Sequence, residues 1–212
     1  FDPQANLTQS CGIVNPPVCI YSSLSKNLPL PIINIKDDLD LVPASLDLAG
    51  IEIELSARMA RETYLKKLFY GMQTKYDCVL IDCPPSLGLL TINALVASNK
   101  VLIPMEAEYL AFRGVNGIIN ISNSVKEHFN PSLDISGVFL TKYNSQRKLT
   151  HEIELGIHKY FGDVLLKSKI RVNVSLAESQ ASGVDIFQYD LTSNGAKDYQ
   201  NLVIELIFKK II

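Results

Sequence analysis

Short apolar runs alternate with longer amphipathic segments along the chain. The apolar runs predict strands at Leu39–Pro43, Asp77–Asp82, Val101–Pro104 and Ile135–Thr141. Three apolar residues follow one another directly in Val79-Leu80-Ile81 and in Val101-Leu102-Ile103, as is typical of strands buried on both faces. Alternation of such strands with helices predicts an α/β fold, with a mostly parallel sheet and helices on both faces.

Apolar residues at three- and four-residue steps predict the helices. The predicted ranges are Leu46–Leu55, Ala57–Gln73, Gly88–Ser98, Phe112–Phe129, Leu149–Phe161 and Gly195–Phe208. Ser45 and Ser56 precede two of these ranges and are predicted N-caps. The last helix should bury one stripe, made of Tyr199, Leu202, Val203, Leu206 and Ile207. Ile13–Lys36 holds four prolines and is predicted to be a surface connection.

Composition supports a single folded domain. The 212 residues are 47% hydrophobic and 20% charged, which is ordinary for a globular protein. The four cysteines lack metal-ligand spacing, so we predict that Cys78 and Cys83 are small buried apolar residues in a reduced, cytoplasmic protein. No apolar run reaches the roughly 18 residues of a membrane span. Because the sequence opens at Phe1 without Met, we expect a fragment or a processed product.

The charge is unevenly distributed. Residues 142–171 hold seven basic and three acidic residues, a net +4 within a chain of net −2. A basic region on an acidic body indicates anion binding, although a solvated helical face explains the charge equally well.

The sharpest local motif is the apolar run that ends in Asp82, followed by Cys83-Pro84-Pro85-Ser86. Ligands of open parallel sheets collect at the carboxyl ends of the strands, where an acid is placed to orient Mg²⁺ beside phosphates. An aspartate at a strand end also caps loops, so this reading needs support. The opening Asp2-Pro3-Gln4, taken alone, predicts only a turn.

Six ordered segments together resemble the ParA/Soj family of deviant Walker ATPases, relatives of MinD. They are Asp2-Pro3-Gln4-Ala5-Asn6, the run from Asp82 to Ser86, residues 87–95, Ile103–Tyr109, Gly137–Thr141 and Asn173–Glu178. The resemblance runs nearly from end to end of the chain, in the order of the family.

The resemblance implies roles in binding and hydrolysing ATP with Mg²⁺. Asp2 corresponds to the acid that orients the attacking water, and Asp82 to the acid that holds the water shell of magnesium. Arg171 and Asn173 lie where the family's late loop borders the adenine. The family usually has Pro at the position of Arg171 and Arg at that of Val172, so side-chain contacts to the base are in question here.

The resemblance also implies an ATP-dependent homodimer that binds nonspecific DNA, is stimulated by a ParB-like partner and associates with the nucleoid in the cytoplasm. The arginine positions that serve DNA binding in the family are Gln146 and Ser175 here. The nearby basic residues are predicted to substitute for them: Arg147, Lys148, Lys169 and Arg171.

The family's phosphate-binding Walker A loop, a Gly-rich turn ending in Lys-Thr, is absent from the sequence, as is any Gly-Lys-Thr or Gly-Lys-Ser. We therefore interpret residues 1–212 as one ParA-like domain that lacks the N-terminal strand and this loop.

Three other interpretations stay open. A MinD-like membrane ATPase would need an amphipathic end, which Leu206–Ile212 mildly resembles, although a last core helix without stable membrane association is the expectation. A degenerate, non-enzymatic module that binds DNA or a partner would explain the missing loop, but not the retained Asp2 and Asp82. A synthase of the cobyrinic acid type shares the fold, but the sequence has no glutaminase-like Cys/His region.

Without a phosphate cradle, residues 1–212 alone should bind ATP weakly or not at all, because the backbone N–H groups and the lysine of that loop hold the phosphates. Equilibrium titration of the purified 212-residue chain with a fluorescent ATP analogue measures this, and micromolar affinity would contradict the expectation.

Overall fold

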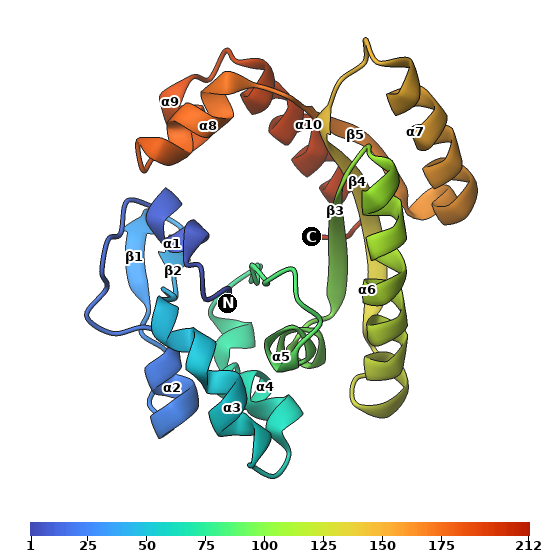
Figure 1. Cartoon of the computed structure of the whole chain (residues 1–212). Helices are drawn as coiled ribbons and strands as arrows, with labels where there is room; N and C mark the ends of the chain where they lie inside the picture. Colours follow the sequence, from blue (N-terminus) through green and yellow to red (C-terminus); the bar gives the residue numbers. More distant parts are fainter.

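The computed structural model covers residues 1–212 and describes every side chain except those of residues 73, 109–113, 148–149 and 151. Its main sheet is parallel and has three strands in the order β3 (Lys100–Glu106), β4 (Asp134–Tyr143) and β5 (Leu165–Arg171) (Figure 1). The predicted α/β class is therefore confirmed, as are the strands predicted at Val101–Pro104 and Ile135–Thr141.

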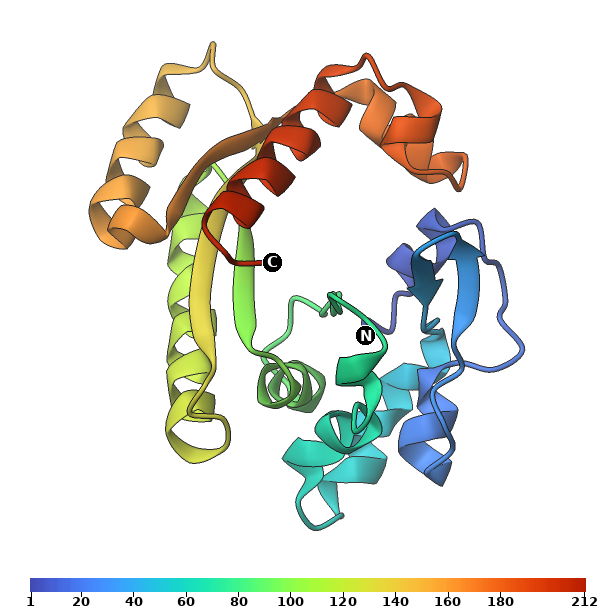
Figure 2. The same ribbon diagram turned by 180° about the vertical axis from the view of Figure 1, so that it is seen from behind.

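Helices cover both faces of this sheet. The two crossover helices, α6 (Tyr109–His128) and α7 (Lys148–Phe161), lie on one face, and α7 leads into the short helix η4 (Gly162–Val164). The last helix, α10 (Asn194–Phe208), lies on the other face and packs on β5 (Figure 2). Successive side chains of a strand point to opposite faces, so each strand contributes to two cores.

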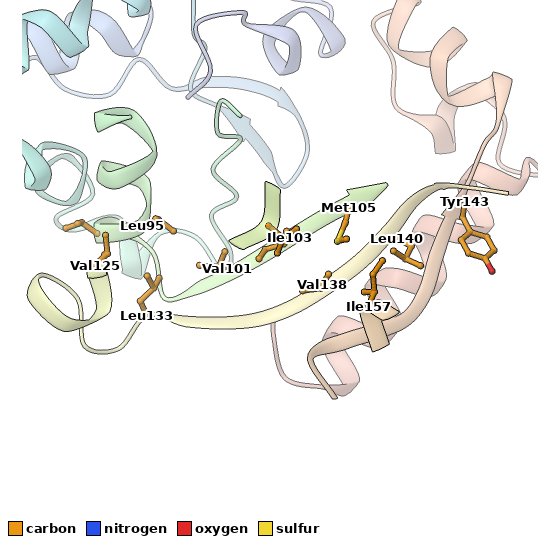
Figure 3. Packing of buried hydrophobic residues seen from close by; sticks show 12 residues of the cluster. Leu95, Val101, Ile103, Met105, Val125, Leu133, Val138, Leu140, Tyr143 and Ile157 are labelled. Carbon is orange, nitrogen blue, oxygen red and sulfur yellow. The ribbon is translucent and has the colours of Figure 1, made fainter. Parts of the chain in front are cut away.

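The larger core lies between the sheet and the crossover helices. Val101, Ile103, Val138 and Leu140 project into it from β3 and β4, and Figure 3 shows them in a row with Leu133 and Ile157. On the opposite face, Leu166 and Ile170 of β5 meet Leu202 and Leu206 of α10. Of the predicted stripe of α10, only Leu202 and Leu206 are buried, whereas Tyr199, Val203 and Ile207 are between 38% and 58% exposed.

The first half of the chain builds a second core of its own. Its elements are α1 (Asn6–Ser10), α2 (Ile20–Lys26), η1 (Leu46–Gly50), α3 (Ile51–Ser56), η2 (Arg61–Thr63), α4 (Tyr64–Leu68), η3 (Met72–Thr74) and α5 (Leu89–Ala97), with the antiparallel pair β1 (Ile33–Lys36) and β2 (Leu39–Leu41). Leu24, Leu48 and Leu65 are fully buried in this core. In Figure 1 α5 connects this core to the layer of the main sheet, since it packs against both α4 and α6.

The strand predicted at Asp77–Asp82 is wrong. This segment is extended coil, and Val79 and Leu80 are 50% and 78% exposed rather than buried on two faces. A strand requires a neighbour that pairs its N–H and C=O groups, and no segment of the described chain pairs with residues 77–82. Apolar sequence alone therefore did not produce a strand. For the same reason Cys78 and Cys83 are exposed, contrary to their predicted burial.

Other differences have local causes. The helix predicted at Ala57–Gln73 is replaced by η2, α4 and η3, since left-handed backbone interrupts it at Ala60 before η2 (φ of 54°) and at Gly71 before η3 (φ of +82°). Ser56 ends α3 instead of capping a following helix, and its hydroxyl donates to the carbonyl of Ile53 at 2.6 Å. β1 lies inside the predicted surface connection, and β5 lies inside the basic region. Helices α8 (Val174–Ala181) and α9 (Ile186–Tyr189) were not predicted either.

Asn93 of α5 joins two elements of the second core. Its amide is completely buried, accepts from Leu65 N at 3.2 Å, and donates to Arg61 O at 2.9 Å and to Leu89 O at 3.0 Å. Asn93→Ala should lower the free energy of unfolding by about 2–4 kcal/mol, because it leaves buried backbone groups unpaired. Urea unfolding followed by circular dichroism measures this.

The matched control is Asn120→Ala, which changes an exposed asparagine in α6 and should alter stability by less than about 0.5 kcal/mol. Equal effects of the two substitutions would contradict the anchoring role of Asn93.

Candidate functional site

Asp2 is held by a turn at the start of α1. Its Oδ1 accepts from Gln4 N at 2.9 Å, and its carbonyl accepts from Ala5 N at 3.0 Å. The predicted turn is therefore confirmed, and α1 follows it. The buried Thr8 hydroxyl accepts from Ala44 N at 3.0 Å, which attaches α1 to the chain after β2. The position of Asp2 is thus set by the second core, that of the first half of the chain, rather than by the sheet.

Asp2 and Asp82 share one neighbourhood. Phe1, the neighbour of Asp2, and Ile81, the neighbour of Asp82, pack against the same core in the first half of the chain. Desolvation raises the thiol pKa of Cys83 to about 11, and the negative charges of Asp82 and Asp2 contribute in the same direction. Cys83 is exposed at its surface, but neighbouring residues still remove part of the water around its sulfur. With its raised pKa the side chain is a neutral thiol near pH 7. The fold therefore brings together two acids that lie 80 positions apart in the sequence.

Arg171 ends β5 and is tied to a buried acid. Its backbone N and Nε both donate to Asp198 Oδ2 at 2.9 Å, and its Nη2 donates to Oδ1 at 2.7 Å. These hydrogen bonds raise the pKa of Arg171 above its ordinary value. Asp198 was missed from the sequence because nothing distinguishes it from a surface acid of an amphipathic helix. The guanidinium that was predicted to face adenine and DNA is thus occupied by a structural partner.

Asn173 occupies the N-cap position of α8 without capping it. Its side chain accepts no hydrogen bond from the helix, and its Oδ1 is buried with no partner among the described residues. A Cβ on Gly195 would lie 3.1 Å from this oxygen, so the glycine leaves room for the asparagine. An unpaired buried carbonyl oxygen is costly, and an amino group of a bound ligand would satisfy it.

The predicted DNA-binding residues gather near Tyr143, at the carboxyl ends of β4 and β5. Lys169 forms an ion pair with Glu154, and its Nζ lies 4.4 Å from the centre of the Tyr143 ring. Tyr143 pairs in register with Arg171. Arg147 precedes α7 and is exposed, and it has no ion pair with any side chain that the structure describes. Lys148 lies outside the described side chains.

One predicted carboxylate serves magnesium, but the phosphates of a nucleotide have no cradle in these residues. Asp82 carries oxygen atoms of the kind that hold the water shell of Mg²⁺, whereas Asp2 is predicted to orient the attacking water. Within the described side chains, no group of three or more His, Cys, Asp or Glu residues is arranged to hold a metal ion. The sequence also contains no Gly-Lys-Thr or Gly-Lys-Ser. Residues 1–212 therefore fit the magnesium side of a nucleotide site and not its phosphate side.

The structure also bears on a membrane role. Within the described part of the chain, no helix has the length and apolar character needed to cross a bilayer. The end of α10 nevertheless exposes Ile204, Ile207 and Phe208, the last of them at 87%.

Known proteins resemble the chain along nearly its whole length. A family model described as "AAA domain" matches residues 1–135. The sporulation initiation inhibitor protein Soj of Bacillus subtilis is 40% identical over 97% of this chain and 83% of its own length. The chromosome-partitioning ATPase Soj of Treponema pallidum is 36% identical over 98% of this chain and 83% of its own length.

Solved structures agree with these relatives. A putative plasmid partition protein of Borrelia burgdorferi, bound to AMPPNP, has a TM-score of 0.81 and 28% identity, covering 99% of this chain and 84% of its own. Cobyrinic acid a,c-diamide synthase of Mycobacterium smegmatis, with bound ADP and magnesium, has a TM-score of 0.71 and 34% identity, covering 76% and 67%. On these matches the chain belongs to the ParA/Soj family of partition ATPases.

Proposed function

We propose that the protein is an ATPase that drives plasmid or chromosome partition through an ATP-dependent dimer bound to nonspecific DNA. The observation that carries this proposal is the shared neighbourhood of Asp2 and Asp82, whose neighbours Phe1 and Ile81 pack against one core. A protein without ATP hydrolysis has no chemical need for two acids held together in this way. In the proposed reaction Asp2 orients a water toward the γ-phosphorus, and Asp82 holds the hydration shell of Mg²⁺.

The proposal requires a phosphate cradle from polypeptide beyond these 212 residues. Two features offer it a place. β3 is an edge strand of the sheet, so one side of its backbone is unpaired. Val79 and Leu80, in the extended segment that leads to Asp82, expose apolar surface. An added strand that pairs with β3 and with the segment of Val79 and Leu80 would cover the exposed apolar side chains and extend the sheet.

For the base, Asn173 is the better supported of the two predicted contacts. Its Oδ1 is buried and without a partner among the described residues, whereas the guanidinium of Arg171 already bonds Asp198. For DNA, Arg147 is the most available of the three predicted residues that the structure describes, because it is exposed while Lys169 and Arg171 are paired with Glu154 and Asp198. We further infer a ParB-like partner, a homodimer and a location on the nucleoid in the cytoplasm, in keeping with the family.

A MinD-like role on membranes is the second candidate, favoured by the exposed Ile204, Ile207 and Phe208 beside Lys209 and Lys210. Sedimentation with anionic lipid vesicles, with and without residues 206–212, separates it from the partition role. A degenerate module without enzymatic activity is separated by the ATP hydrolysis assay described next.

Asp2→Ala in the intact protein should keep ATP binding and lower turnover roughly a hundredfold or more, because the attacking water loses its orientation. The mutant should then remain on DNA as an ATP-bound dimer. Phosphate release and DNA retention with ATP measure the two effects. The control is Asp37→Ala, an exposed acid of the turn between β1 and β2, for which normal turnover is expected. Fast turnover by Asp2→Ala would remove Asp2 from its proposed role.

Arg147→Ala should weaken DNA binding equally for all sequences and reduce the salt slope of log K by about 0.9, the value for one lost phosphate contact. Fluorescence anisotropy with two unrelated duplexes at several salt concentrations measures the slope. Lys26→Ala, an exposed lysine at the end of α2, is the matched control. An unchanged slope for Arg147→Ala would exclude its contact with DNA.

A further inference from the structure

Two helices from opposite ends of the chain finish with the same backbone motif. Gly12, with φ of +76°, directly follows the C-cap residue of α1, and Gly183, with φ of +68°, directly follows the C-cap residue of α8. In α1, Gly12 N donates to Gln9 O and Ile13 N donates to Thr8 O. In α8, Gly183 N donates to Gln180 O and Val184 N donates to Ser179 O. Both are Schellman motifs, which need a residue that tolerates a left-handed backbone.

The two glycines touch each other. A Cβ added to Gly183 would lie 2.9 Å from Gly12 Cα, and one added to Gly12 would lie 3.2 Å from the carbonyl oxygen of Gly183. α1 and α8 pack together along with this contact. The first distance is shorter than real Cβ contacts, and its partner is backbone, which does not move aside. Glycine at 183 therefore serves the approach of the two helix ends as well as the local turn.

An ion pair stands beside the glycine contact. Lys36 of β1 donates to Asp185 Oδ2 at 2.6 Å. The other oxygen of Asp185 accepts from Phe187 N and Gln188 N at 3.0 Å, which caps α9. The hydrogen bond from Lys36 lowers the pKa of Asp185, with help from these backbone N–H groups. The ion pair and the glycine contact thus join the same two parts of the chain, and Figure 2 has α1 and β1 on the same side of the molecule as α8 and α9.

Each helix in this contact directly follows a segment that holds a residue of the candidate site. The Asp2 turn leads directly into α1, and Asn173 is the N-cap residue of α8. Because both helices are short and stiff, fixing their ends against each other restricts the position of Asp2 relative to Asn173. The other route between these residues is the chain from 13 to 172, through both cores and the sheet.

We propose that Gly12, Gly183, Lys36 and Asp185 form a clasp that positions Asp2 with respect to the nucleotide bound at Asn173. These are positioning residues, since none of them reaches the reacting atoms. The inference rests on the proposed ATPase function and adds a positioning role to it. The clasp holds α1 against α8, so Asp2 keeps the place that the proposed hydrolysis needs.

The test is Gly183→Ala in the intact protein, compared with Gly71→Ala. Gly71 has φ of +82° and no atom within 4 Å of an added Cβ, so the control carries the backbone strain without the clash. Amide hydrogen exchange by mass spectrometry should be about tenfold faster in residues 8–13 of Gly183→Ala, although the substitution lies in the other helix. Gly71→Ala should leave this segment unchanged.

Single-turnover hydrolysis supplies the second readout. Gly183→Ala should lower the rate constant roughly ten- to a hundredfold with little change in ATP affinity, as expected for a misplaced catalytic group. In an Asp2→Ala background it should lower the rate no further, because it acts through Asp2. A merely structural role predicts that the two losses multiply.

Lys36→Gln is the milder variant and is expected to fold even if Gly183→Ala does not. Its control is Lys100→Gln, which breaks the Lys100–Asp134 pair of 3.8 Å at the start of β3 and β4. Lys36→Gln should change exchange and hydrolysis in the same direction as Gly183→Ala. Unchanged exchange in residues 8–13, or multiplicative losses, in a protein that hydrolyses ATP would overturn the clasp alone. No hydrolysis by the unmodified protein would overturn the proposed function and the positioning role with it.

Discussion

The burial of the β3–β4–β5 sheet on both faces is the constraint on which the second half of the molecule depends. Val101, Ile103, Val138 and Leu140 enter the core below the crossover helices, while Leu166 and Ile170 enter the core below α10. Burial on two faces forces the strands into register, and parallel strands end at one edge. The loop that leads to α7, the ion pair of Arg171 with Asp198 and the start of α8 are all positioned by that edge.

At this edge of the sheet, basic side chains form ion pairs that connect β5 to the neighbouring helices α7 and α10. Two of the four basic side chains predicted to bind DNA already have partners within the chain. Lys169 and Arg171 each form an ion pair with an acidic side chain. Their attraction for a phosphate backbone is reduced by those partners, whereas Arg147 is exposed and has no ion pair with any side chain that the structure describes. Lys169 and Arg171 therefore act first as structural ion-pair partners.

The site itself depends on contacts between distant parts of the chain. Asp2 is positioned by α1, and α1 is attached through Thr8 to residue 44 and through Gly12 to residue 183. Asn173 is positioned by β5 and α8, with Gly195 of α10 giving it room. A nucleotide held between them would contact parts of the chain that belong to two hydrophobic cores. The position of one core relative to the other would then set the distance between Asp2 and the bound nucleotide, and with it the rate of hydrolysis.

The sequence by itself determined the α/β class, the strands β3 and β4 and the long helices, because an apolar run that finds a neighbouring strand, or a long helical periodicity, produces the element that its local pattern predicts. The motifs around Asp2 and Asp82 were also readable from the sequence, since they are short and contiguous. Only the tertiary structure decided that residues 77–82 form no hydrogen bonds with a neighbouring strand, that Arg171 forms an ion pair with Asp198, and that Gly12 contacts Gly183. Each of these depends on which backbone or charge lies opposite in space, and no local pattern of residues encodes that partner.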